Sequence, residues 1–196
     1  KKYNLRIVTL PSLDDLFSGK IKINQIKDLN TNDLLGRVAI EGQNELLVKN
    51  IESKNILVSG AGGSIGNELC RQIIQCNPDQ LVLLDQSEIG LFEIYNELIS
   101  LLEKNKLDFE IVPVLGNICD REFLEGVFKN YNINTIYHAA AYKHVDLVEK
   151  NPIIGMKNNI FGTLNLSELA KDYDINNFTL ISSDKAVNPT NIMGAT

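Results

Sequence analysis

The sequence predicts a doubly wound α/β fold, in which a parallel sheet of the Rossmann type carries helices on both faces. Two observations predict it. From residue 54 onward, short apolar runs alternate with stretches of helical periodicity, and the first apolar run leads directly into a glycine-rich turn. Unbroken apolar runs are typical of strands that are buried on both faces. Strands that alternate with helices form a parallel sheet through crossover connections.

Five apolar runs are the expected strands, and four stretches with apolar residues three or four positions apart are expected helices. The strands are expected at residues 55–59, 81–85, 110–115, 135–138 and 178–182. The apolar stripes of the helices are Ile65, Leu69, Ile73 and Cys76; Phe92, Tyr95, Ile99 and Leu102; Leu124, Val127, Phe128 and Tyr131; and Ile153, Met156, Ile160 and Leu164. We expect each stripe to pack its helix on the sheet.

Residues 1–50 differ from the rest and are interpreted as a linker and the remnant of a preceding domain. A short apolar run over residues 6–10 ends at Pro11, and residues 20–26 alternate polar and apolar side chains as an exposed edge strand does. No face of this stretch is apolar enough to form a core of its own. The predicted α/β domain therefore covers residues 51–196.

The composition argues against several classes of function. The formal net charge of −6 argues against a nucleic-acid partner, because phosphate backbones attract basic surfaces. No run approaches the roughly 20 apolar residues that span a bilayer, so this segment itself is not expected to cross a membrane. The three cysteines lack the spacing of metal ligands. We expect no metal site and a reducing, cytoplasmic environment.

The glycine-rich turn after the first strand has the features that a dinucleotide pyrophosphate requires. Gly60 permits a tight turn, Gly63 leaves room where a phosphate meets the backbone, and Gly66 permits close helix–strand packing. Ser64 and Ile65 open the helix, whose free amides and partial positive charge attract phosphate. The spacing is G-x-x-G-x-x-G, and its place between a buried strand and an amphipathic helix makes it a specific signal.

An acidic residue, Asp85, ends the second expected strand, nineteen positions after Gly66 (85 − 66). Its carboxylate is placed to accept hydrogen bonds from both ribose hydroxyls of an adenosine and to repel a 2′-phosphate. The alternative is a turn aspartate, since aspartate is common after strands. The preceding glycine turn favours the binding role, and with it NAD rather than NADP as the cofactor.

The third expected strand leads into residues with two interpretations of about equal weight. The side-chain amide of Asn117 can pair with an adenine edge, with Ile118 beside it as a further cofactor contact, or Asn117 can be a simple turn residue. We expect Asp120 to cap the helix that covers residues 121–130, because aspartate is a preferred N-cap residue.

Small residues follow the fourth expected strand. Ala139, Ala140 and Ala141 allow a flat ligand to approach the backbone, so we expect them to contact the cofactor. Lys143 lies at the carboxyl edge of the sheet, where open α/β folds bind their ligands. The two histidines of the chain, one of which is His138, lack the companions of a metal site, and a structural role is the favoured interpretation.

A hydroxyl, a carboxylate and an ammonium group follow the fifth expected strand in succession, as Ser183, Asp184 and Lys185. The carboxyl end of a central strand is where this type of fold places acid–base chemistry. A polar turn that leads into the loop at Pro189 is the alternative. From the residues alone the two interpretations are nearly even.

Together these motifs resemble the extended branch of the short-chain dehydrogenase/reductase superfamily, and within it the bacterial nucleotide-diphospho-sugar 4,6-dehydratases. The segments that carry the resemblance are residues 60–66, 138–145, 158–163 and 182–191. The likeness extends from about residue 50 to residue 196, and residues 34–37 resemble the linker ahead of the family's catalytic domain. The nearest type is the large, membrane-anchored UDP-N-acetylglucosamine 4,6-dehydratase of polysaccharide and protein-glycan biosynthesis.

The resemblance implies an internal redox reaction on a UDP-sugar. A hydride passes from sugar C4 to NAD, water is eliminated across C5 and C6, and the hydride returns to C6. The product is a 4-keto-6-deoxy sugar nucleotide. Base and acid must flank the C5–C6 bond, because the C5 proton becomes acidic only once C4 is a ketone.

The family's functional residues map onto this chain one by one. Asp184 matches the acid that protonates the departing C6 hydroxyl, and Lys185 matches the base that takes the C5 proton. Ser183 replaces a threonine and keeps the hydroxyl that relays the C4 proton. Asn159 matches the asparagine that shapes the active-site helix. Two further positions, Lys143 and Asn188, are assigned to substrate binding.

The chain departs from the superfamily at its catalytic tyrosine. Met193 occupies that position, and a thioether cannot act as a base. The large dehydratase type shares this departure. The lysine that follows the tyrosine by four positions would be residue 197, so we expect a truncated fragment that ends before the last strands and lacks activity. The full-length protein is expected to be a homo-oligomer, anchored in the bacterial inner membrane, with this domain in the cytoplasm.

Two other functions are weighed against the dehydratase. A nucleotide-sugar epimerase shares the fold and cofactor but is expected to keep the tyrosine, so Met193 and the Asp184–Lys185 pair speak against it. A nucleotide-binding module without chemistry is the third hypothesis. A lysine at position 197 and a further sugar-binding domain would favour the enzyme.

Overall fold

The computed structural model describes residues 8–9, 27–28 and 44–196, and the chain divides into two compact units, residues 1–43 and 44–196. In the first unit, β1 (Val8–Thr9) pairs antiparallel with β2 (Lys27–Asp28). The first of these strands lies within the run expected at residues 6–10. The edge strand expected at residues 20–26 lies outside the described residues.

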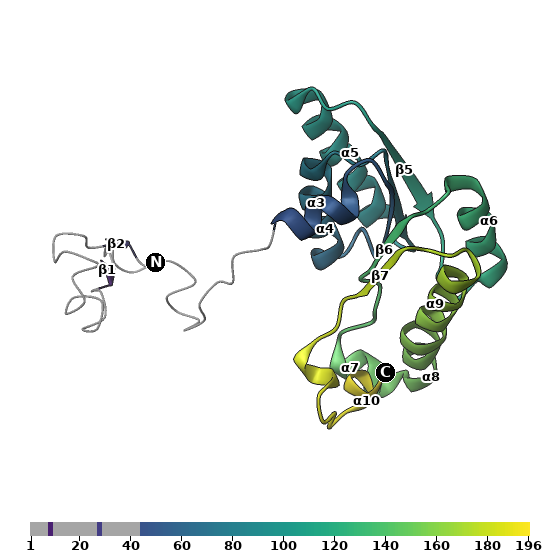
Figure 1. Cartoon of the computed structure of the whole chain (residues 1–196). Coiled ribbons are helices and arrows are strands. Elements are labelled where there is room, and N and C mark those ends of the chain that lie inside the picture. The colour runs from purple at the N-terminus through teal and green to yellow at the C-terminus, as the bar shows by residue number, and fades with distance from the viewer. Residues whose placement is uncertain (1–7, 10–26, 29–43) are drawn as a thin grey trace. The chain divides into compact units, whose positions relative to one another are not determined.

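The second unit alternates strands and helices along the chain (Figure 1). Its elements are α3 (Asn44–Ile51), β3 (Asn55–Ser59), α4 (Ser64–Ile73), the 3-10 helix η1 (Ile74–Cys76), β4 (Gln80–Asp85), α5 (Glu88–Asn105), β5 (Glu110–Leu115), α6 (Arg121–Tyr131), β6 (Thr135–His138), α7 (Val145–Lys150), α8 (Pro152–Met156), the π-helix η2 (Lys157–Gly162), α9 (Thr163–Asp172), β7 (Asn177–Leu180), the 3-10 helix η3 (Asp184–Ala186) and α10 (Ile192–Ala195).

The strands form one parallel sheet in the order β5-β4-β3-β6-β7, which confirms the predicted doubly wound α/β fold. In the central register, Ile56 of β3 lies opposite Leu81 of β4 on one side and Thr135 of β6 on the other. The predicted strands agree with the observed ones to within two residues, and β7 ends at Leu180, before the expected residue 182.

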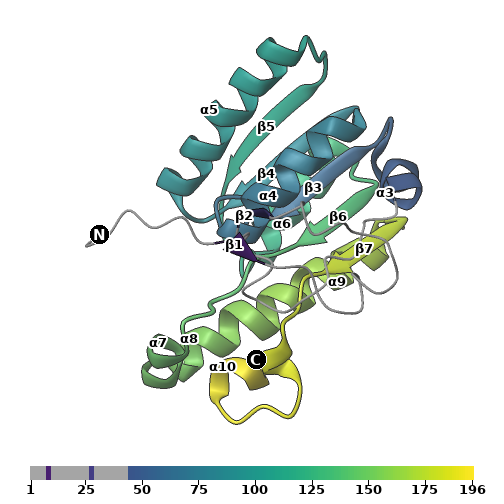
Figure 2. The ribbon, with the colours of Figure 1, turned by 90° about the vertical axis from the view of Figure 1, so that its left-hand side faces the viewer.

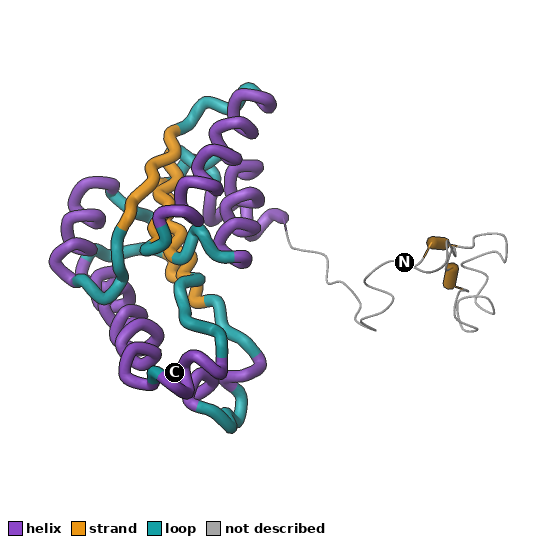
Figure 3. The backbone as a smooth tube through the Cα atoms, turned by 180° about the vertical axis from the view of Figure 1, so that it is seen from behind, coloured by secondary structure: helices purple, strands orange, loops and turns teal. Residues whose placement is uncertain are grey.

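Helices cover both faces of the sheet (Figure 2), as the backbone view from behind also shows (Figure 3). Alternate residues of β3 divide between the two layers. Ile56 and Val58 belong to the core that packs with α4 and α5, whereas Leu57 belongs to the core that packs with α6 and α9. This division follows from the two-residue period of a strand, which turns successive side chains to opposite faces.

The unbroken apolar runs are buried as predicted in the three inner strands. Every residue of β6 is buried, as are the residues of β3 after Asn55 and the four inner residues of β4. The two edge strands differ, because β5 buries only Ile111 and Val114, and no residue of β7 is fully buried. An edge strand has a neighbour on one side only, so its outer residues stay accessible.

The helix stripes predicted for α4 and α5 are confirmed at Ile73 and Leu102, which are buried, and wrong at Ile65 and Phe92. The other predicted members are half-buried against the same core: Leu69, Cys76, Tyr95 and Ile99. In α4 the buried residues are Gly66, Cys70 and Ile73, and Ile65 is 54% exposed. In α5 the buried residues are Leu91, Ile94, Leu98 and Leu102, and Phe92 is 67% exposed. Both helices carry apolar residues on adjacent faces, so spacing alone left two stripes to choose from. The stripe predicted for α6 is confirmed at Leu124, Val127 and Phe128.

The stripe predicted for residues 153–164 is wrong at every position, since Ile153, Met156, Ile160 and Leu164 are all exposed. The inward residues are instead small or polar: Gly155, Asn158, Asn159 and Gly162. The π-helix η2 explains part of the shift, because its wider turn changes the phase of the residues that follow. In α9 the buried face then continues with Leu166, Leu169 and Ala170.

The predicted boundary at residue 50 falls within the last turn of α3, and this helix belongs to the second unit. Ile51 is buried in the core beside α4, and the Thr135 hydroxyl of β6 donates a hydrogen bond to the Asn50 carbonyl at 3.0 Å. The second unit therefore begins at Asn44. In the described part of the chain, no helix combines the length and the apolar character that crossing a membrane demands.

We predict that Leu98→Ala lowers the free energy of unfolding by about 2–5 kcal/mol, because Leu98 is fully buried against the sheet. The matched control is Phe92→Ala on the same helix, which should cost less than about 1 kcal/mol because the ring is mostly exposed. Urea unfolding of both variants measures the difference. Equal losses would show that the core face of α5 is wrongly assigned.

Candidate functional site

The carboxyl ends of β3, β4, β5 and β6 border a groove of about 210 Å³. The strand order reverses there, because the chain builds outward from β3 to β5 and then returns to place β6 on the other side of β3. Open α/β sheets bind their ligands at such a point. The groove is lined by Gly60, Gly62, Gly63, Leu84, Asp85, Gln86, Ser87, Gly116, Asn117, Ile118, Ala139, Ala140, Ala141, Tyr142 and Asn158.

The glycine turn is packed too tightly for side chains at three of its positions: Gly60, Gly62 and Gly66. Gly60 has a φ of 75°, a left-handed conformation that favours glycine, and a Cβ on it would lie 2.6 Å from the Ala140 nitrogen. A Cβ on Gly66 would collide with the Gly60 carbonyl oxygen. Gly60 therefore provides the tight turn, and Gly66 brings α4 close to β3, as the sequence predicts.

The amino-terminal end of α4 faces this turn without a side-chain cap. Gly63 is the N-cap residue, and it makes no side-chain hydrogen bond to the first turn of the helix. The first amides of a helix have no partner within it and carry partial positive charge. Ser64 and Ile65 open the helix outside the groove lining, so what the turn offers a phosphate is backbone rather than side chains.

Asp85 lies in the wall of the groove and fastens two backbone segments. Its Oδ2 accepts a hydrogen bond from the Gly62 amide at 2.8 Å, and its Oδ1 accepts one from the Ser87 amide at 2.8 Å. The carboxylate of Asp85 therefore stabilises two turns, as the turn interpretation expects. It does not compete with ribose binding, since each carboxylate oxygen has a second acceptor site.

Gln86 is a residue of the groove that the sequence analysis missed. Its Oε1 accepts a hydrogen bond from Asn117 Nδ2 at 3.1 Å, and its Nε2 donates to the Tyr142 hydroxyl at 3.0 Å. The bridge joins the loops after β4, β5 and β6. Its only sequence signal is its place directly after Asp85, at the end of a strand. Asn117 also closes a turn, because its Oδ1 accepts from the Cys119 amide at 2.8 Å.

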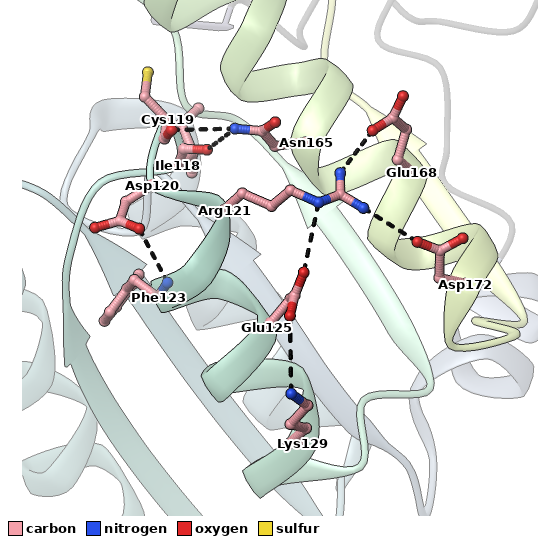
Figure 4. Close-up of polar contacts among 10 residues, drawn as sticks. All are labelled: Ile118, Cys119, Asp120, Arg121, Phe123, Glu125, Lys129, Asn165, Glu168 and Asp172. Atoms are coloured by element: carbon pink, nitrogen blue, oxygen red, sulfur yellow. Dashed lines mark hydrogen bonds and ion pairs between the residues drawn. The ribbon is translucent and has the colours of Figure 1, made fainter.

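The loop after β5 is held against α9 (Figure 4). Asn165 Nδ2 donates hydrogen bonds to the carbonyls of Ile118 and Cys119 at 3.1 and 3.2 Å. Arg121 forms ion pairs with Glu168 at 2.6 Å and with Asp172 at 3.2 Å. These contacts fix the buried Ile118 side chain in the groove wall.

The predicted cap of α6 is confirmed, because Asp120 Oδ1 accepts a hydrogen bond from the Phe123 amide at 3.0 Å (Figure 4). Asp120 is not among the residues that line the groove. Its side chain starts the helix, and this leaves the preceding residues, Asn117 and Ile118, facing the groove. The alanines after β6 complete the opposite wall, where Ala139 and Ala140 are half-buried and Ala141 is exposed.

His138 is a buried structural residue, as the sequence favours. Its Nδ1 lies 2.6 Å from the Ser59 hydroxyl, and its Nε2 lies 2.8 Å from the Thr163 hydroxyl. Burial lowers the pKa of His138 from 6.5 to about 4, because a charged imidazole loses its hydration in the core. The ring is therefore neutral at pH 7.

Asn159 lies at the turn of η2, where its side chain holds the loop after β6. Its Oδ1 accepts a hydrogen bond from the Tyr142 amide at 2.8 Å, and its Nδ2 donates to the Tyr142 carbonyl at 3.1 Å. Nδ2 also donates to the Thr196 hydroxyl at 3.0 Å. The side chain thus joins the loop beside the groove to the end of α10.

The three residues expected to carry acid–base chemistry follow β7 on an accessible loop. Ser183 caps η3, with its hydroxyl accepting from the Lys185 amide at 3.3 Å. Lys185 Nζ lies 3.8 Å from Asp184 Oδ1, and the two side chains are 53% and 91% exposed. The side chains of the expected acid and the expected base thus lie near each other and are exposed to solvent.

The loop continues past Asn188, which is exposed and has a φ of 48°, into α10. Met193 of α10 is buried, and Gly194 packs so closely on the Lys185 carbonyl that a Cβ would collide with it. The amino end of α10 is capped from α7, because the Glu149 carboxylate accepts a hydrogen bond from the Ile192 amide at 2.6 Å. Glu149 is a second residue that the sequence analysis missed.

Lys143 does not line the groove. It borders a second, mainly apolar cavity of about 220 Å³, which shares Tyr142 with the groove and lies against α7 and α8. The other lining residues of this cavity are His144, Leu147, Val148, Asn151, Ile154 and Gly155. Lys143 therefore lies beside the groove and not inside it.

Residues 56–196 match a protein family described as polysaccharide biosynthesis protein. The chain belongs to this family. The capsular polysaccharide biosynthesis protein CapD of Staphylococcus aureus is 40% identical over 192 residues, which are 98% of this chain and 32% of CapD. An inverting UDP-N-acetylglucosamine 4,6-dehydratase of Campylobacter jejuni is 31% identical over 144 residues, which are 73% of this chain and 40% of that enzyme.

Among solved structures, Pen from Bacillus thuringiensis is similar with a TM-score of 0.66 and 30% identity, over 74% of this chain and 44% of that chain. This chain spans less than half of each of these relatives. The likenesses confirm the predicted family, an extended short-chain dehydrogenase/reductase among the nucleotide-sugar dehydratases.

We predict that acid destabilises the chain through His138. The pKa of His138 in the folded state, about 4, lies below its unfolded value of 6.5, so the unfolded state takes up the proton first. The stability that the neutral ring contributes is complete above pH 6.5 and is lost as the pH falls toward 4. The difference in unfolding free energy between the native chain and His138→Gln should therefore shrink by about 3 kcal/mol from pH 7 to pH 4.

Urea unfolding at a series of pH values measures this difference. The exposed His144 provides the control, because His144→Gln removes an imidazole without removing a buried one. A difference between the native chain and His138→Gln that stays constant from pH 7 to pH 4 would refute the linkage.

Proposed function

We propose that the protein is an NAD-dependent nucleotide-sugar 4,6-dehydratase, with UDP-N-acetylglucosamine as its substrate. The product is a 4-keto-6-deoxy sugar nucleotide for surface polysaccharide or protein glycosylation. The observation that carries the proposal is that one edge of the sheet holds both a groove suited to a dinucleotide and the acid–base pair of Asp184 and Lys185. The likeness to the Campylobacter jejuni dehydratase supports the reaction.

The residues of the groove fit NAD. The uncapped first turn of α4, after Gly63, offers amides to a pyrophosphate, and Asp85 offers acceptor sites to ribose hydroxyls. Among the described residues that line the groove, none is lysine or arginine, which a 2′-phosphate would need. These features support NAD over NADP. The chemistry that NAD supplies when bound is the reversible acceptance of a hydride.

The chain's own residues perform the elimination in this proposal. The Lys185 amine takes the proton from C5, and the electrons of the C5–H bond form the π bond of a C5=C6 double bond as the C6–O bond breaks. The C6 hydroxyl leaves as water with a proton from the Asp184 carboxyl group. Their positions on adjacent residues, with Nζ and Oδ1 3.8 Å apart, support action at adjacent carbons.

Other residues relay a proton, position the backbone or bind the substrate in this proposal. The Ser183 hydroxyl relays the proton of the C4 hydroxyl, a task that the buried Met193 thioether cannot perform. Asn159 fixes the loop of Tyr142 and the end of α10 with three hydrogen bonds. Lys143 and Asn188, both exposed, are the proposed contacts for the UDP-sugar.

The wider setting of the protein is part of the proposal. We infer a homo-oligomer, supported by the exposed apolar side chains of Ile153, Ile160, Phe161 and Leu164 along α8, η2 and α9. The resemblance to the membrane-anchored type supports a cytoplasmic catalytic domain in a protein attached to the inner membrane. Of residues 1–50, which the sequence predicts to be a linker and the remnant of a preceding domain, residues 1–43 lie outside the second unit and keep that role in the proposal.

We predict that Lys185→Met in the full-length protein abolishes deuterium exchange at C5 of UDP-N-acetylglucosamine in D₂O, because no other base follows it in the loop. Lys171→Met, which removes an exposed lysine from the last turn of α9, is the control and should exchange like the native protein. Asp184→Asn should still oxidise C4, seen as nicotinamide absorbance, but should form little dehydrated product. NMR of the recovered sugar nucleotide measures both. C5 exchange that survives in Lys185→Met would show that Lys185 is not the base.

A further inference from the structure

A series of buried and half-buried hydrogen bonds runs from β3 through β6 to α9 and η2, and it joins the start of the glycine turn to the π-helix. It starts at Ser59, the last residue of β3, and passes through the imidazole of His138 on β6. It continues through the hydroxyl of Thr163, at the start of α9, to the backbone carbonyl of Asn159 in η2. Its three contacts measure 2.6, 2.8 and 2.6 Å. The proposed reaction uses none of the side chains of Ser59, His138 and Thr163.

The direction of these bonds is fixed by counting protons. A carbonyl oxygen can only accept, so the Thr163 hydroxyl gives its single proton to the Asn159 carbonyl. The Thr163 oxygen must then accept from Nε2–H of His138. In the neutral ring the Nδ1 atom is left without a proton, so it accepts the hydroxyl proton of Ser59. The contacts therefore select one tautomer of the imidazole.

At one end, this series of hydrogen bonds attaches to the backbone of the π-helix. The Thr163 amide donates to the Ile160 carbonyl, three residues back, and leaves the Asn159 carbonyl without its α-helical partner. The Thr163 hydroxyl takes that place at 2.6 Å. Asn159 is also the residue whose side chain fastens Tyr142 and Thr196. The orientation of this clamp therefore depends on the backbone that Thr163 holds.

At the other end, this series of hydrogen bonds holds the start of the glycine turn. Ser59 immediately precedes Gly60, the residue with the left-handed backbone, and its carbonyl accepts a hydrogen bond from the Ala139 amide at 2.9 Å. The side chain of Ser59 is fully buried and bonded to the ring of His138. A displacement of β3 relative to β6 would break this bond and would also change the spacing of the groove walls.

We propose that His138 is a positioning residue, whose neutral Nε2–H tautomer couples the glycine turn after Ser59 to the π-helical turn that carries Asn159. The inference rests on the proposed function only for what the two turns do, since the coupling itself is a property of this chain. The ring acts as a spacer with one donor and one acceptor at opposite ends, which no other neutral side chain provides at this length.

The first test is nitrogen-15 NMR of the histidine rings in the native chain at pH 7. The expected result is a buried imidazole with a protonated Nε2 and an unprotonated Nδ1, showing the coupling from Nε2 to its attached proton. A protonated Nδ1, or a ring that exchanges between tautomers, would overturn the proposal. This measurement needs no variant, so it remains decisive if a substitution prevents folding.

The second test is a double-mutant cycle on Ser59 and Thr163, which touch the same ring but not each other. Ser59→Ala and Thr163→Val each break the same series of hydrogen bonds, so their effects on stability should not be independent. The factor by which the double variant raises the unfolding equilibrium constant should be at least about threefold smaller than the product of the two single-variant factors. Additive effects would overturn the proposal. Thr163→Ser keeps the hydroxyl and should retain both the native tautomer and most of the native stability.

The control is Thr135→Val, which removes a buried hydroxyl from β6 that donates to the Asn50 carbonyl and contacts neither His138 nor Thr163 by a hydrogen bond among the described residues. Its effect should multiply with that of Thr163→Val, and a deviation equal to that of the Ser59 pair would overturn the proposal. None of these readouts requires a ligand. A native chain that fails to bind NAD would therefore contradict the proposed function while leaving this coupling measurable.

Discussion

The backbone of Gly60 lies against the backbone of Ala140, so close that a methyl group on Gly60 would come within 2.6 Å of the Ala140 nitrogen. This approach sets the distance between β3 and β6 where the strand order reverses, and the groove opens at the same point. Gly66 repeats the constraint one turn later, because α4 packs on the Gly60 carbonyl. Strand spacing, helix position and groove width therefore depend on positions that exclude side chains. Because glycines occupy these positions, the surface that a ligand meets there consists of backbone amides.

Polar contacts extend this constraint to the rest of the carboxyl edge. Asp85 ties the turn to the end of β4, and His138 ties the end of β3 to the π-helical turn. Asn159 then carries the connection to the loop of Tyr142. Buried polar groups of this kind cost free energy unless every partner is present, so they tolerate few alternative arrangements. The outcome is a connected frame beside the exposed loop that carries Asp184 and Lys185, the proposed acid and base.

The fold was largely predictable because strands buried on both faces leave unbroken apolar runs and because glycine marks the close approach. The buried faces of the helices were less predictable. Because α4 and α5 have apolar residues next to their buried stripes, hydrophobic spacing alone does not determine which of two adjacent faces is buried. The buried face of the π-helix η2 could not be predicted from apolar spacing, because it consists of the small or polar residues Asn158, Asn159 and Gly162. The roles of Gln86 and Glu149 were not predicted, because they arise from contacts with residues far away in sequence. The partners of Gln86 are 31 and 56 positions away, and the partner of Glu149 is 43 positions away.

The most direct test of the account is a titration of the nitrogen-15-labelled chain with NAD, followed through its backbone amide resonances. We predict that the largest shifts fall on the amides of residues 60–66 and 139–141, because the phosphates and the flat rings meet the backbone there. Smaller shifts should follow at Gln86 and Asn117, whose bridge crosses the groove. Shifts confined to the opposite edge of the sheet, around Asn132 and Asn176, or the absence of shifts in the glycine turn at saturating NAD, would contradict it.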